Sequence, residues 1–568
     1  MRAPVSVDRP PSDPEAHFDV VIVGSGFGGS VTGFRLAEAG LSVCILERGK
    51  AYPPGSFPRS PWAMSRNFWD PSEGMHGLFD VWSFRGLGGI VASGLGGGSL
   101  LYSNVVLRKD EATFVKEDLE HGGYEYWPVT YADLEPHYER HERMLAVSPY
   151  PFDRPPYDHT YKTRAMQFAA DKLGLQWLLP NLAISFAGPD SAPGEPVRDD
   201  LPNLHGRTRL TCRLCGECNV GCNYGSKNTL DFNYLSRALE HGARIRTRCE
   251  VKSFAPRSGG GYTITFVDHS DAVEGEKRAG SPRLHTITAD RLVLSAGSFG
   301  TTYLLLKNRH AFPELSERLG TRFCGNGDIL MLAIEATEDD GGPRIVDPGY
   351  GPVITSTIRV KDALEGGPGR AYYIQDGGHP QAVNWIIEAS YQLGILRRAI
   401  RFAWGLVQLW LRFTRRSEIG REMAAMLSSN LSSSSMPLFS MGRDIPDGTM
   451  TLTSDGYLDV HWTTRRSEQY FGNVRRTGRE VSDALGAAFM DNPSWYLSRV
   501  TTVHPLGGCP MGRDAREGVA DSHGRVFGYP GLVIADGSVM PGPVGPNPSN
   551  TIAALAHRAA DRIIAEAE

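Results

Sequence analysis

FDVVIVGSGFGGSVTGFRLAEAGLSVCILE, residues 18–47, decides the fold of this chain. Its first seven residues are almost all apolar, which is typical of a buried parallel strand. They run into a turn with Gly24, Gly26 and Gly29 in G-x-G-x-x-G register, and a helical pattern follows. A second apolar run then ends at the acid Glu47. This order of strand, glycine turn, helix and strand predicts a βαβ unit that binds a nucleotide.

Each part of this unit has a physical role in holding a dinucleotide. The glycines let the backbone approach a pyrophosphate, and the N-terminus of the helix supplies partial positive charge. Glu47 lies 23 residues after Gly24, where an acid accepts a hydrogen bond from a ribose hydroxyl. The motif alone does not separate FAD from NAD.

Two later segments extend the prediction. RGLGGIVASGLGGGSLLYSN, residues 85–104, sets its glycines among apolar residues, whereas flexible linkers are rich in serine and charge. The block is therefore typical of a backbone that lies close to a flat ligand. RLVLSAGSFGTTYLLLKN, residues 291–308, predicts another buried strand, a turn and a helix start. Because this strand comes after a long insertion, we expect the nucleotide-binding domain to be discontinuous.

Two loops late in the chain carry residue types that suit acid–base chemistry. TVHPLGGCPMG, residues 502–512, contains His504, and the loop after the strand pattern LVIAD contains Asn547. Histidine can accept a proton near neutral pH, and asparagine can donate a hydrogen bond to an alkoxide. A turn histidine without a catalytic role is the alternative for His504.

Together these motifs resemble the glucose–methanol–choline (GMC) oxidoreductase family, and within it the bacterial cholesterol oxidase-like flavoenzymes that hold FAD non-covalently. The resemblance rests on GSGFGG with Glu47, LGGGSLLYSN, LSAGSFGTTYLL, HPLGGCPMG and ADGSVMPGPVGPNPSNTIAAL, in the family's order. It implies an α/β fold: a doubly wound, Rossmann-like FAD-binding domain with an inserted α+β substrate domain built on an antiparallel sheet.

The expected division of the chain follows the order of these motifs. The FAD-binding domain is expected to take residues 16–120, 205–325 and 500–568, and the substrate domain residues 121–204 and 326–499. Within the substrate domain, TMTLTSDGYLDVHW (449–462) predicts a hairpin around Asp455-Gly456.

The resemblance also implies roles for individual residues. His504 would orient the alcohol and accept or relay its proton, and Asn547 would face the substrate oxygen and the flavin. The implied cofactor-binding residues are Gly24, Gly26, Gly29 and Glu47 for the ADP half, Gly97, Gly98, Ser99, Tyr102, Ser103 and Asn104 for the isoalloxazine, and Asp536 and Gly537 for the ribityl chain and pyrophosphate.

The activity implied is oxidation of a lipophilic alcohol, sterol-like or long-chain, to a carbonyl. Hydride would pass to flavin N5, with oxygen as the expected acceptor. Three alternatives stay open at this point: a dehydrogenase that passes electrons to quinone or a protein partner, a non-redox flavoprotein lyase on the same fold, and a membrane-bound binding protein without chemistry.

One position departs from the pattern of the steroid oxidases. Those enzymes carry a glutamate on a central strand of the substrate domain, where it moves a proton during double-bond isomerisation. In AYYIQDGGHP (371–380), Gln375 occupies the comparable position, with Asp376 and Glu388 nearby. An amide cannot act as a base, so coupled isomerisation is not expected.

TCRLCGECNVGC, residues 211–222, places four cysteines at the C-x2-C-x2-C-x3-C spacing of bacterial ferredoxins. They are Cys212, Cys215, Cys218 and Cys222. Three uses stay open: structural thiols or a disulfide loop, an iron–sulfur cluster, and a zinc site. We expect no metal, because a second cysteine run is missing and flavin chemistry needs no metal.

LGILRRAIRFAWGLVQLWLRFTRR, residues 393–416, carries six arginines and no acid. It is either a core helix with snorkelling arginines or a helix lying in a membrane interface. The second interpretation favours a lipophilic alcohol over a sugar or choline.

Composition narrows the class of protein further. The formal net charge is -5, so the chain has no global basic field for nucleic acid. No run of eighteen apolar residues predicts a membrane-spanning helix. The first 15 residues are polar and proline-rich without the apolar core of a secretory signal, so we expect a disordered leader and a cytoplasmic protein, with peripheral membrane contact as an option.

Overall fold

The computed structural model describes residues 16–199, 202–278, 280–381, 384 and 431–568. The predicted leader and the arginine-rich segment 393–416 lie outside the described residues.

The first sheet has seven strands in the order β12-β2-β1-β15-β14-β13, and β24 pairs with the end of β15. Its strands are β1 (His17–Val23), β2 (Val43–Leu46), β12 (Arg244–Arg246), β13 (Cys249–Pro256), β14 (Tyr262–Asp268), β15 (Leu284–Leu294) and β24 (Leu532–Ile534). Strands β12, β2, β1, β15 and β24 run parallel to their neighbours, and β14 and β13 continue the sheet antiparallel. Parallel strands of this kind are buried on both faces, and β2 is buried throughout.

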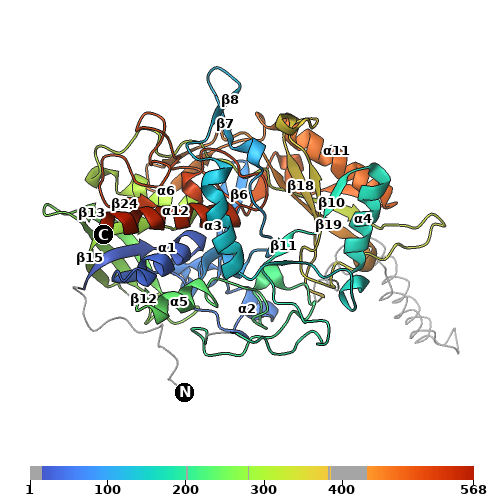
Figure 1. The fold of residues 1–568 in the computed structure, drawn as a ribbon, viewed down its shortest axis with the longest axis horizontal. Coiled ribbons are helices and arrows are strands. Elements are labelled where there is room, and N and C mark those ends of the chain that lie inside the picture. Colours follow the sequence, from blue (N-terminus) through green and yellow to red (C-terminus); the bar gives the residue numbers. More distant parts are fainter. Residues whose placement is uncertain (1–15, 200–201, 279, 382–383, 385–430) are drawn as a thin grey trace, which may run out of the picture.

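Helices cover one face of this sheet. Helix α1 (Phe27–Glu38) packs on α5 (Tyr234–Glu240) and α12 (Ser549–Ala567), and α12 packs on α3 (Tyr131–Met144). Figure 1 shows α1 and α12 side by side, with α3 crossing α12, although α12 is the last helix in the described part of the chain. The start of the nucleotide-binding unit is thus covered by residues from the other end of the chain.

The second sheet has six antiparallel strands in the order β10-β17-β18-β19-β16-β22. Its strands are β10 (Gln176–Leu178), β16 (Ile329–Ile334), β17 (Thr357–Val360), β18 (Tyr372–Asp376), β19 (Met436–Gly442) and β22 (Ala488–Asp491). Helices α4 (Tyr161–Leu173) and α11 (Glu468–Ala484) pack against each other and against this sheet, on the right in Figure 1.

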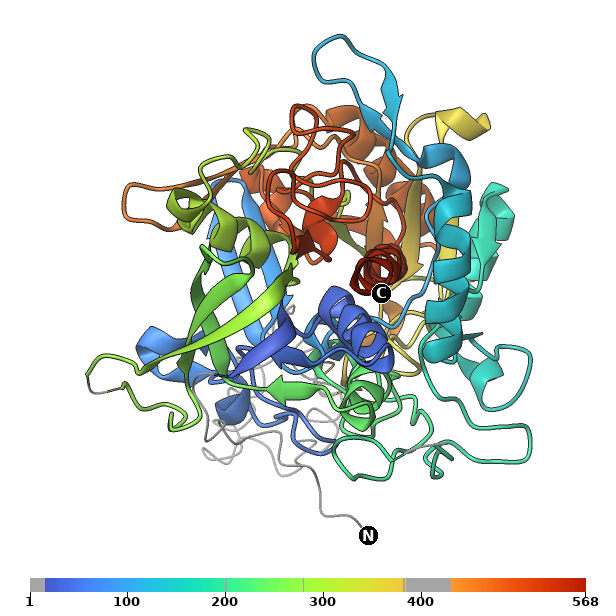
Figure 2. The ribbon, with the colours of Figure 1, turned by 60° about the vertical axis from the view of Figure 1, so that its left-hand side comes forward.

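A small third sheet joins distant parts of the chain, because β5 (Phe79–Phe84) and β6 (Leu87–Ala92) form a hairpin and β23 (Val500–Thr502) adds to β6 in parallel. Figure 2 shows this hairpin beside the first sheet. Helix α6 (Gly297–Lys307) follows β15 directly. Among the described residues, further short elements are α2 (Pro61–Met64), β3 (Trp69–Asp70), β4 (Met75–His76), β7 (Val115–Glu117), β8 (Tyr124–Tyr126), β9 (Ser148–Pro149), β11 (Asn181–Leu182), α10 (Leu431–Ser434) and nine 3-10 turns.

The structure confirms the predicted fold class: a parallel-cored sheet with helices and a separate antiparallel sheet. It also confirms the hairpin around Asp455-Gly456, as β20 (Thr449–Leu452) and β21 (Leu458–His461). These two strands form a sheet of their own and do not extend the six-stranded one. The domain boundaries given above stay a prediction. Within the part of the chain that the structure describes, we find no helix both long and apolar enough to cross a bilayer.

Candidate active site

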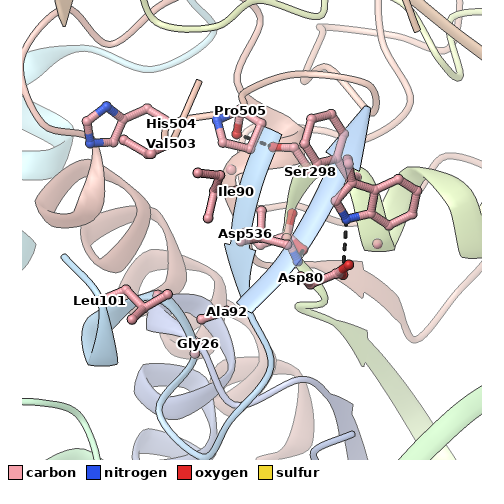
Figure 3. A pocket seen from close by; sticks show the side chains of 18 of the residues that line it. Gly26, Asp80, Ile90, Ala92, Leu101, Ser298, Val503, His504, Pro505 and Asp536 are labelled. Atoms are coloured by element: carbon pink, nitrogen blue, oxygen red, sulfur yellow. Dashed lines mark hydrogen bonds between the residues drawn. The ribbon is translucent and has the colours of Figure 1, made fainter. Parts of the chain in front are cut away.

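One cavity of about 910 Å³ lies between the two large sheets. Its lining comes from the glycine turn after β1, from β5 and β6, from the start of α6, from β16 and β19, and from the loops that follow β23 and β24. Figure 3 shows Gly26 and His504 at opposite ends of this cavity, with Ile90 and Ala92 of β6 between them. The cavity therefore joins the nucleotide-binding turn to the candidate catalytic residues.

Each of the three positions in the first turn requires glycine for a different structural reason. Gly24 has φ +97°, and a Cβ there would lie 2.3 Å from the carbonyl oxygen of Ser295. A Cβ on Gly29 would lie 2.0 Å from the carbonyl oxygen of Gly24, so this residue allows the helix to pack on the strand. A Cβ on Gly26 would meet nothing within 4 Å. The space above Gly26 is the cavity itself, which is the cradle that a pyrophosphate requires.

Three helices begin at the cavity. Residues Gly26 and Phe27 at the start of α1, Gly297 and Ser298 at the start of α6, and Pro548 and Ser549 at the start of α12 all line it. The residue that precedes each helix makes no side-chain cap, but at α6 the carboxylate of Asp536 accepts from the backbone N–H of Gly297, so the N-termini of α1 and α12 are the ones left without a side-chain cap. Helix N-termini carry partial positive charge and free N–H groups, so their convergence favours an anionic ligand such as a dinucleotide.

Ser25 connects the two glycine-rich segments through Glu47. Its backbone N–H and hydroxyl donate to Oε2 of Glu47 at 3.0 and 2.6 Å, and its hydroxyl oxygen accepts from the backbone N–H of Gly96 at 3.0 Å. A Cβ on Gly97 would lie 2.6 Å from Cα of Gly26, so the two segments are in backbone contact. The second glycine block is therefore a wall of the same site rather than a linker.

Asp536 ties the end of β24 to the start of α6. Its carboxylate accepts from the backbone N–H of Gly297 at 2.9 Å and from the hydroxyls of Thr301 and Ser538 at 2.5 and 2.6 Å. Burial raises the pKa of Asp536 above its usual range. These bonds fix the loop that closes the cavity beside Gly537.

Asp328 orients the imidazole of His504. Oδ1 of Asp328 lies 2.8 Å from Nδ1 of His504, and Oδ2 accepts from the backbone N–H groups of Val503 and His504 at 2.8 and 3.1 Å. Thr502 donates its hydroxyl to the same oxygen at 2.9 Å. A carboxylate accepts hydrogen bonds, so Nδ1 carries the proton and Nε2 keeps its lone pair. This is the tautomer that a general base requires.

Asn547 lies in the same cavity and is oriented from the antiparallel sheet. Its Oδ1 accepts a hydrogen bond from Nε2 of Gln375 on β18 at 2.8 Å, and both residues are buried. Nδ2 of Asn547 is therefore the group left to donate to a ligand.

The lining of the cavity is mainly apolar. The antiparallel sheet and the segments around it contribute Ile329, Leu330, Ile354, Phe439, Met441, Trp495 and Val500, with the polar residues Ser440, Asn492, Ser494, Arg499 and Thr501 among them. Such a lining favours a ligand that is mostly hydrocarbon with a few polar groups.

The four cysteines of 211–222 line a separate cavity of about 20 Å³. Burial raises the pKa of Cys215 to about 12 and that of Cys212 well above its usual range, so these thiols are protonated. All eight cysteines are unpaired, so the disulfide-loop alternative is wrong. Among the described residues no group of three or more His, Cys, Asp or Glu side chains could hold a metal ion.

The cysteine segment instead supports the second glycine block. Nζ of the buried Lys227 donates to the carbonyl oxygens of Leu100, Tyr102 and Cys218 at 3.1, 2.8 and 3.0 Å. Ser103 donates its hydroxyl to Oδ1 of Asn219 at 2.9 Å. These contacts connect residues 218–227 to the cavity wall.

The cavity collects most of the residues selected from the sequence. Those that line it are Gly24, Gly26, Glu47, Gly97, Gly98, Tyr102, Ser103, His504, Asp536, Gly537 and Asn547. Three selected residues, Gly29, Ser99 and Asn104, are buried behind the lining. Sequence reasoning missed Ser25 and Asp328. Ser25 lies inside the glycine motif, and its hydroxyl could have been selected from the sequence for that reason. Asp328, in GNGDIL, has the pattern of an ordinary acid in a turn and gives no such indication.

Protein families and individual proteins of known function match the segments that form this cavity. The GMC oxidoreductase family matches residues 203–319 and 446–556, and the FAD binding domain family matches residues 19–53. A cholesterol oxidase of Mycobacterium tuberculosis is 31% identical over 96% of this chain and 90% of its own length.

The chain belongs to the GMC oxidoreductase family. A cholesterol oxidase of Acinetobacter baumannii is 28% identical over 97% of this chain and 95% of its own. The 2-methyl-1,2-propanediol dehydrogenase of Mycolicibacterium austroafricanum is 24% identical over 96% and 95%. As a GMC member the protein is an FAD-dependent oxidoreductase that acts on CH–OH groups, which sets aside the lyase and the binding protein.

Proposed function

We propose that this protein oxidises the hydroxyl of a lipophilic alcohol, sterol-like or long-chain, to a carbonyl. The observation that carries the proposal is the mainly apolar lining of the cavity that contains His504. A substrate that is mostly hydrocarbon gains about 25 cal/mol for each Å² of apolar surface it buries there. The names of the two cholesterol oxidases that this chain resembles support the sterol-like class.

FAD fits the cavity, because Gly26 leaves open space at the uncapped start of α1 and Glu47 lines the same end. Residues Gly24, Gly26 and Glu47 would hold the ADP half, and Gly97, Gly98, Tyr102 and Ser103 the isoalloxazine. Bound FAD supplies the hydride acceptor.

His504 and Asn547 act on the alcohol oxygen in this proposal. Nε2 of His504 accepts the hydroxyl proton, and Asp328 stabilises the imidazolium that forms. Nδ2 of Asn547 donates to the oxygen as negative charge develops on it. A lipophilic substrate that fills the cavity would displace water from it, which would strengthen both interactions.

The electron acceptor in the proposal is oxygen, with a quinone or a protein as the alternative, since one relative is a dehydrogenase by name. Contact of residues 393–416 with a membrane surface and a cytoplasmic location are further proposals, and both rest on the sequence alone.

One experiment tests the substrate class directly. Purified protein is mixed without oxygen with sterols, fatty alcohols, sugars and choline, and loss of the flavin absorbance is followed. We expect bleaching with sterols or fatty alcohols, and peroxide when air is admitted. Bleaching by sugars or choline alone would overturn the proposal. Bleaching by lipids without peroxide would assign the dehydrogenase.

A further inference from the structure

Residues 325–328 form a turn that directly precedes β16, a strand of the six-stranded sheet. Immediately before the turn, Cys324 pairs with Leu506, through two backbone hydrogen bonds of 3.0 Å. The turn closes when the backbone N–H of Asp328 donates to the carbonyl oxygen of Gly325 at 3.2 Å. β16 begins at the next residue, Ile329.

The turn holds His504 through its last residue, Asp328, as described above. The hydroxyl oxygen of Thr502 also lies 3.1 Å from the carbonyl oxygen of Gly325, so its single hydrogen is shared between this oxygen and Oδ2 of Asp328. The segment before His504 is therefore bonded to both ends of the turn.

The turn also holds the loop that carries Asn547, through Asn326. Oδ1 of Asn326 accepts from the backbone N–H of Gly545 at 2.9 Å. Its Nδ2 donates to the carbonyl oxygens of Gly545 and Pro546 at 3.3 and 3.0 Å. The bonded residues directly precede Asn547, and the Asn326 side chain is completely buried.

Three further hydrogen bonds fix the backbone of the turn itself. Its first residue donates a backbone hydrogen bond to Oδ2 of the buried Asp444 at 3.0 Å. The carbonyl oxygen of Asn326 accepts from the backbone N–H of Gly442 at 2.9 Å, and the hydroxyl of Tyr470 donates to the carbonyl oxygen of Gly327 at 3.0 Å.

We propose that Asn326 is a positioning residue that fixes the position of Asn547 relative to His504. In this proposal the turn 325–328 holds the loops of both residues in place. The inference rests on the proposed roles of His504 and Asn547. The two catalytic groups come from separate loops, and this turn bonds to both of them.

The conformation of Asn326 restricts which residues can do this. Its φ is +52°, in the left-handed region that favours glycine and, among other residues, asparagine and aspartate. Of these three, only asparagine both donates and accepts through its side chain. Asn326→Asp keeps the backbone conformation and the oxygen that accepts from Gly545. It replaces the donating Nδ2 with a second oxygen, which would face the carbonyl oxygens of Gly545 and Pro546. Asn326→Gly keeps the conformation and removes every side-chain bond.

The test measures the rate of anaerobic flavin reduction at saturating substrate in Asn326→Gly, Asn326→Asp, Asn547→Ala and the double variant Asn326→Gly/Asn547→Ala. We expect each Asn326 variant to lose about 10- to 100-fold in this rate, as a displacement of about 1 Å does. The dissociation constant of a substrate analogue should change by less than about threefold. FAD content and the thermal midpoint of each variant are recorded alongside.

The double variant decides between positioning and a merely structural role. If Asn326 acts through Asn547, the double variant reduces flavin no more slowly than Asn547→Ala alone. Losses that multiply would overturn the inference. If Asn547→Ala itself keeps the wild-type rate, the proposed role of Asn547 fails, which is a different outcome.

Asn308→Asp serves as the matched control. Asn308 is also buried, accepts from the backbone N–H of Phe254 at 3.3 Å and donates to the carbonyl oxygen of Leu304 at 2.8 Å. We expect the Asn308→Asp substitution to lower the thermal midpoint without slowing flavin reduction. An equal loss of rate in this control would also overturn the inference.

Discussion

Gln375 donates a hydrogen bond from Nε2 to Oδ1 of Asn547 over 2.8 Å, from within the antiparallel sheet. Within the described structure its own Oε1 is buried without a partner. An amide orients its neighbour but offers no basic lone pair. Gln375 therefore fixes Asn547 without adding a second proton acceptor beside His504.

We expect no double-bond isomerisation by this protein, because an amide at position 375 cannot take up and return a proton. A β,γ-unsaturated steroid ketone is incubated with the protein, and the absorbance of the conjugated enone is followed. Enone formation above the uncatalysed rate would contradict the prediction. Gln375→Glu places a carboxyl at the same position, and gain of isomerisation in that variant would show that the site is otherwise competent.

Replacing His504 with alanine should lower the rate of flavin reduction by about two to four orders of magnitude, since a positioned proton acceptor is lost. FAD should stay bound, because the nucleotide-binding turn is at the other end of the cavity. Stopped-flow reduction and the flavin spectrum measure the two quantities. His121→Ala, in which an exposed ring is removed, is the control. A His504 variant within a few-fold of wild type would remove this residue from the mechanism.

The glycine turn gives a prediction that separates binding from folding. Gly26→Ala should fold but lose FAD, because its Cβ meets only the cavity. Gly29→Ala should unfold more readily, since its Cβ would meet the backbone at 2.0 Å. FAD per chain and the thermal midpoint of the apoprotein separate the two. Gly472→Ala, on the exposed face of α11 with open space, should keep FAD and gain about 0.5–1 kcal/mol. Full FAD content in Gly26→Ala would refute the assignment.

Two buried histidines, His141 on α3 and His557 on α12, and the partly buried His137 on α3 predict a loss of stability in acid. Burial lowers the pKa of His137 to about 4, lowers that of His141 to about 3, and holds that of His557 well below its usual value. The unfolded chain binds these protons near pH 6.5, and the folded chain does not. The free energy of unfolding is therefore unaffected by these groups above about pH 7 and falls as the pH drops from about 6.5 to 4.

Each histidine contributes a slope of up to about 1.4 kcal/mol per pH unit in that range. Urea unfolding at a series of pH values measures it. His141→Gln should be less stable at pH 7, because Nδ1 of His141 lies 3.0 Å from the hydroxyl of Tyr234, but its stability should depend less on pH. An identical slope in wild type and His141→Gln would contradict the prediction.

The cysteine segment should hold neither iron nor zinc at one site per chain, and metal analysis of protein prepared without oxygen checks this. Cys212→Ser should reduce the folding yield more than the rate of hydride transfer, because Cys212 belongs to the same buried cluster as Cys218, and residues 218–227 support the cavity wall. Stoichiometric iron with sulfide would contradict both expectations and would favour the dehydrogenase.

The local units of the fold were predictable, and the contacts between them were not. The strand and helix around Gly26 and the hairpin at Asp455-Gly456 follow from nearby residues, so the sequence shows them. The order of the six antiparallel strands depends on pairings between distant segments, which no local pattern records.

The candidate site divides in the same way. His504 and Asn547 stand in distinctive motifs, whereas the residues that orient them do not. Asp328 is 176 residues from His504, and Asn326 is 219 residues from Gly545. GNGD reads as a solvent-exposed turn, and only the packing of two distant loops around it gives these two side chains their partners.

The packing of α12 on α1 has a consequence for biosynthesis. Glu47 and Asn547 line one cavity, and a ribosome makes the second about 500 residues after the first. At about 5–20 residues per second this interval lasts about 25 to 100 s. Throughout that time the first βαβ unit lacks the helix that covers α1. Cofactor capture is therefore a late event for the nascent chain, and a chaperone that shields the exposed face of α1 would have its greatest effect in that interval.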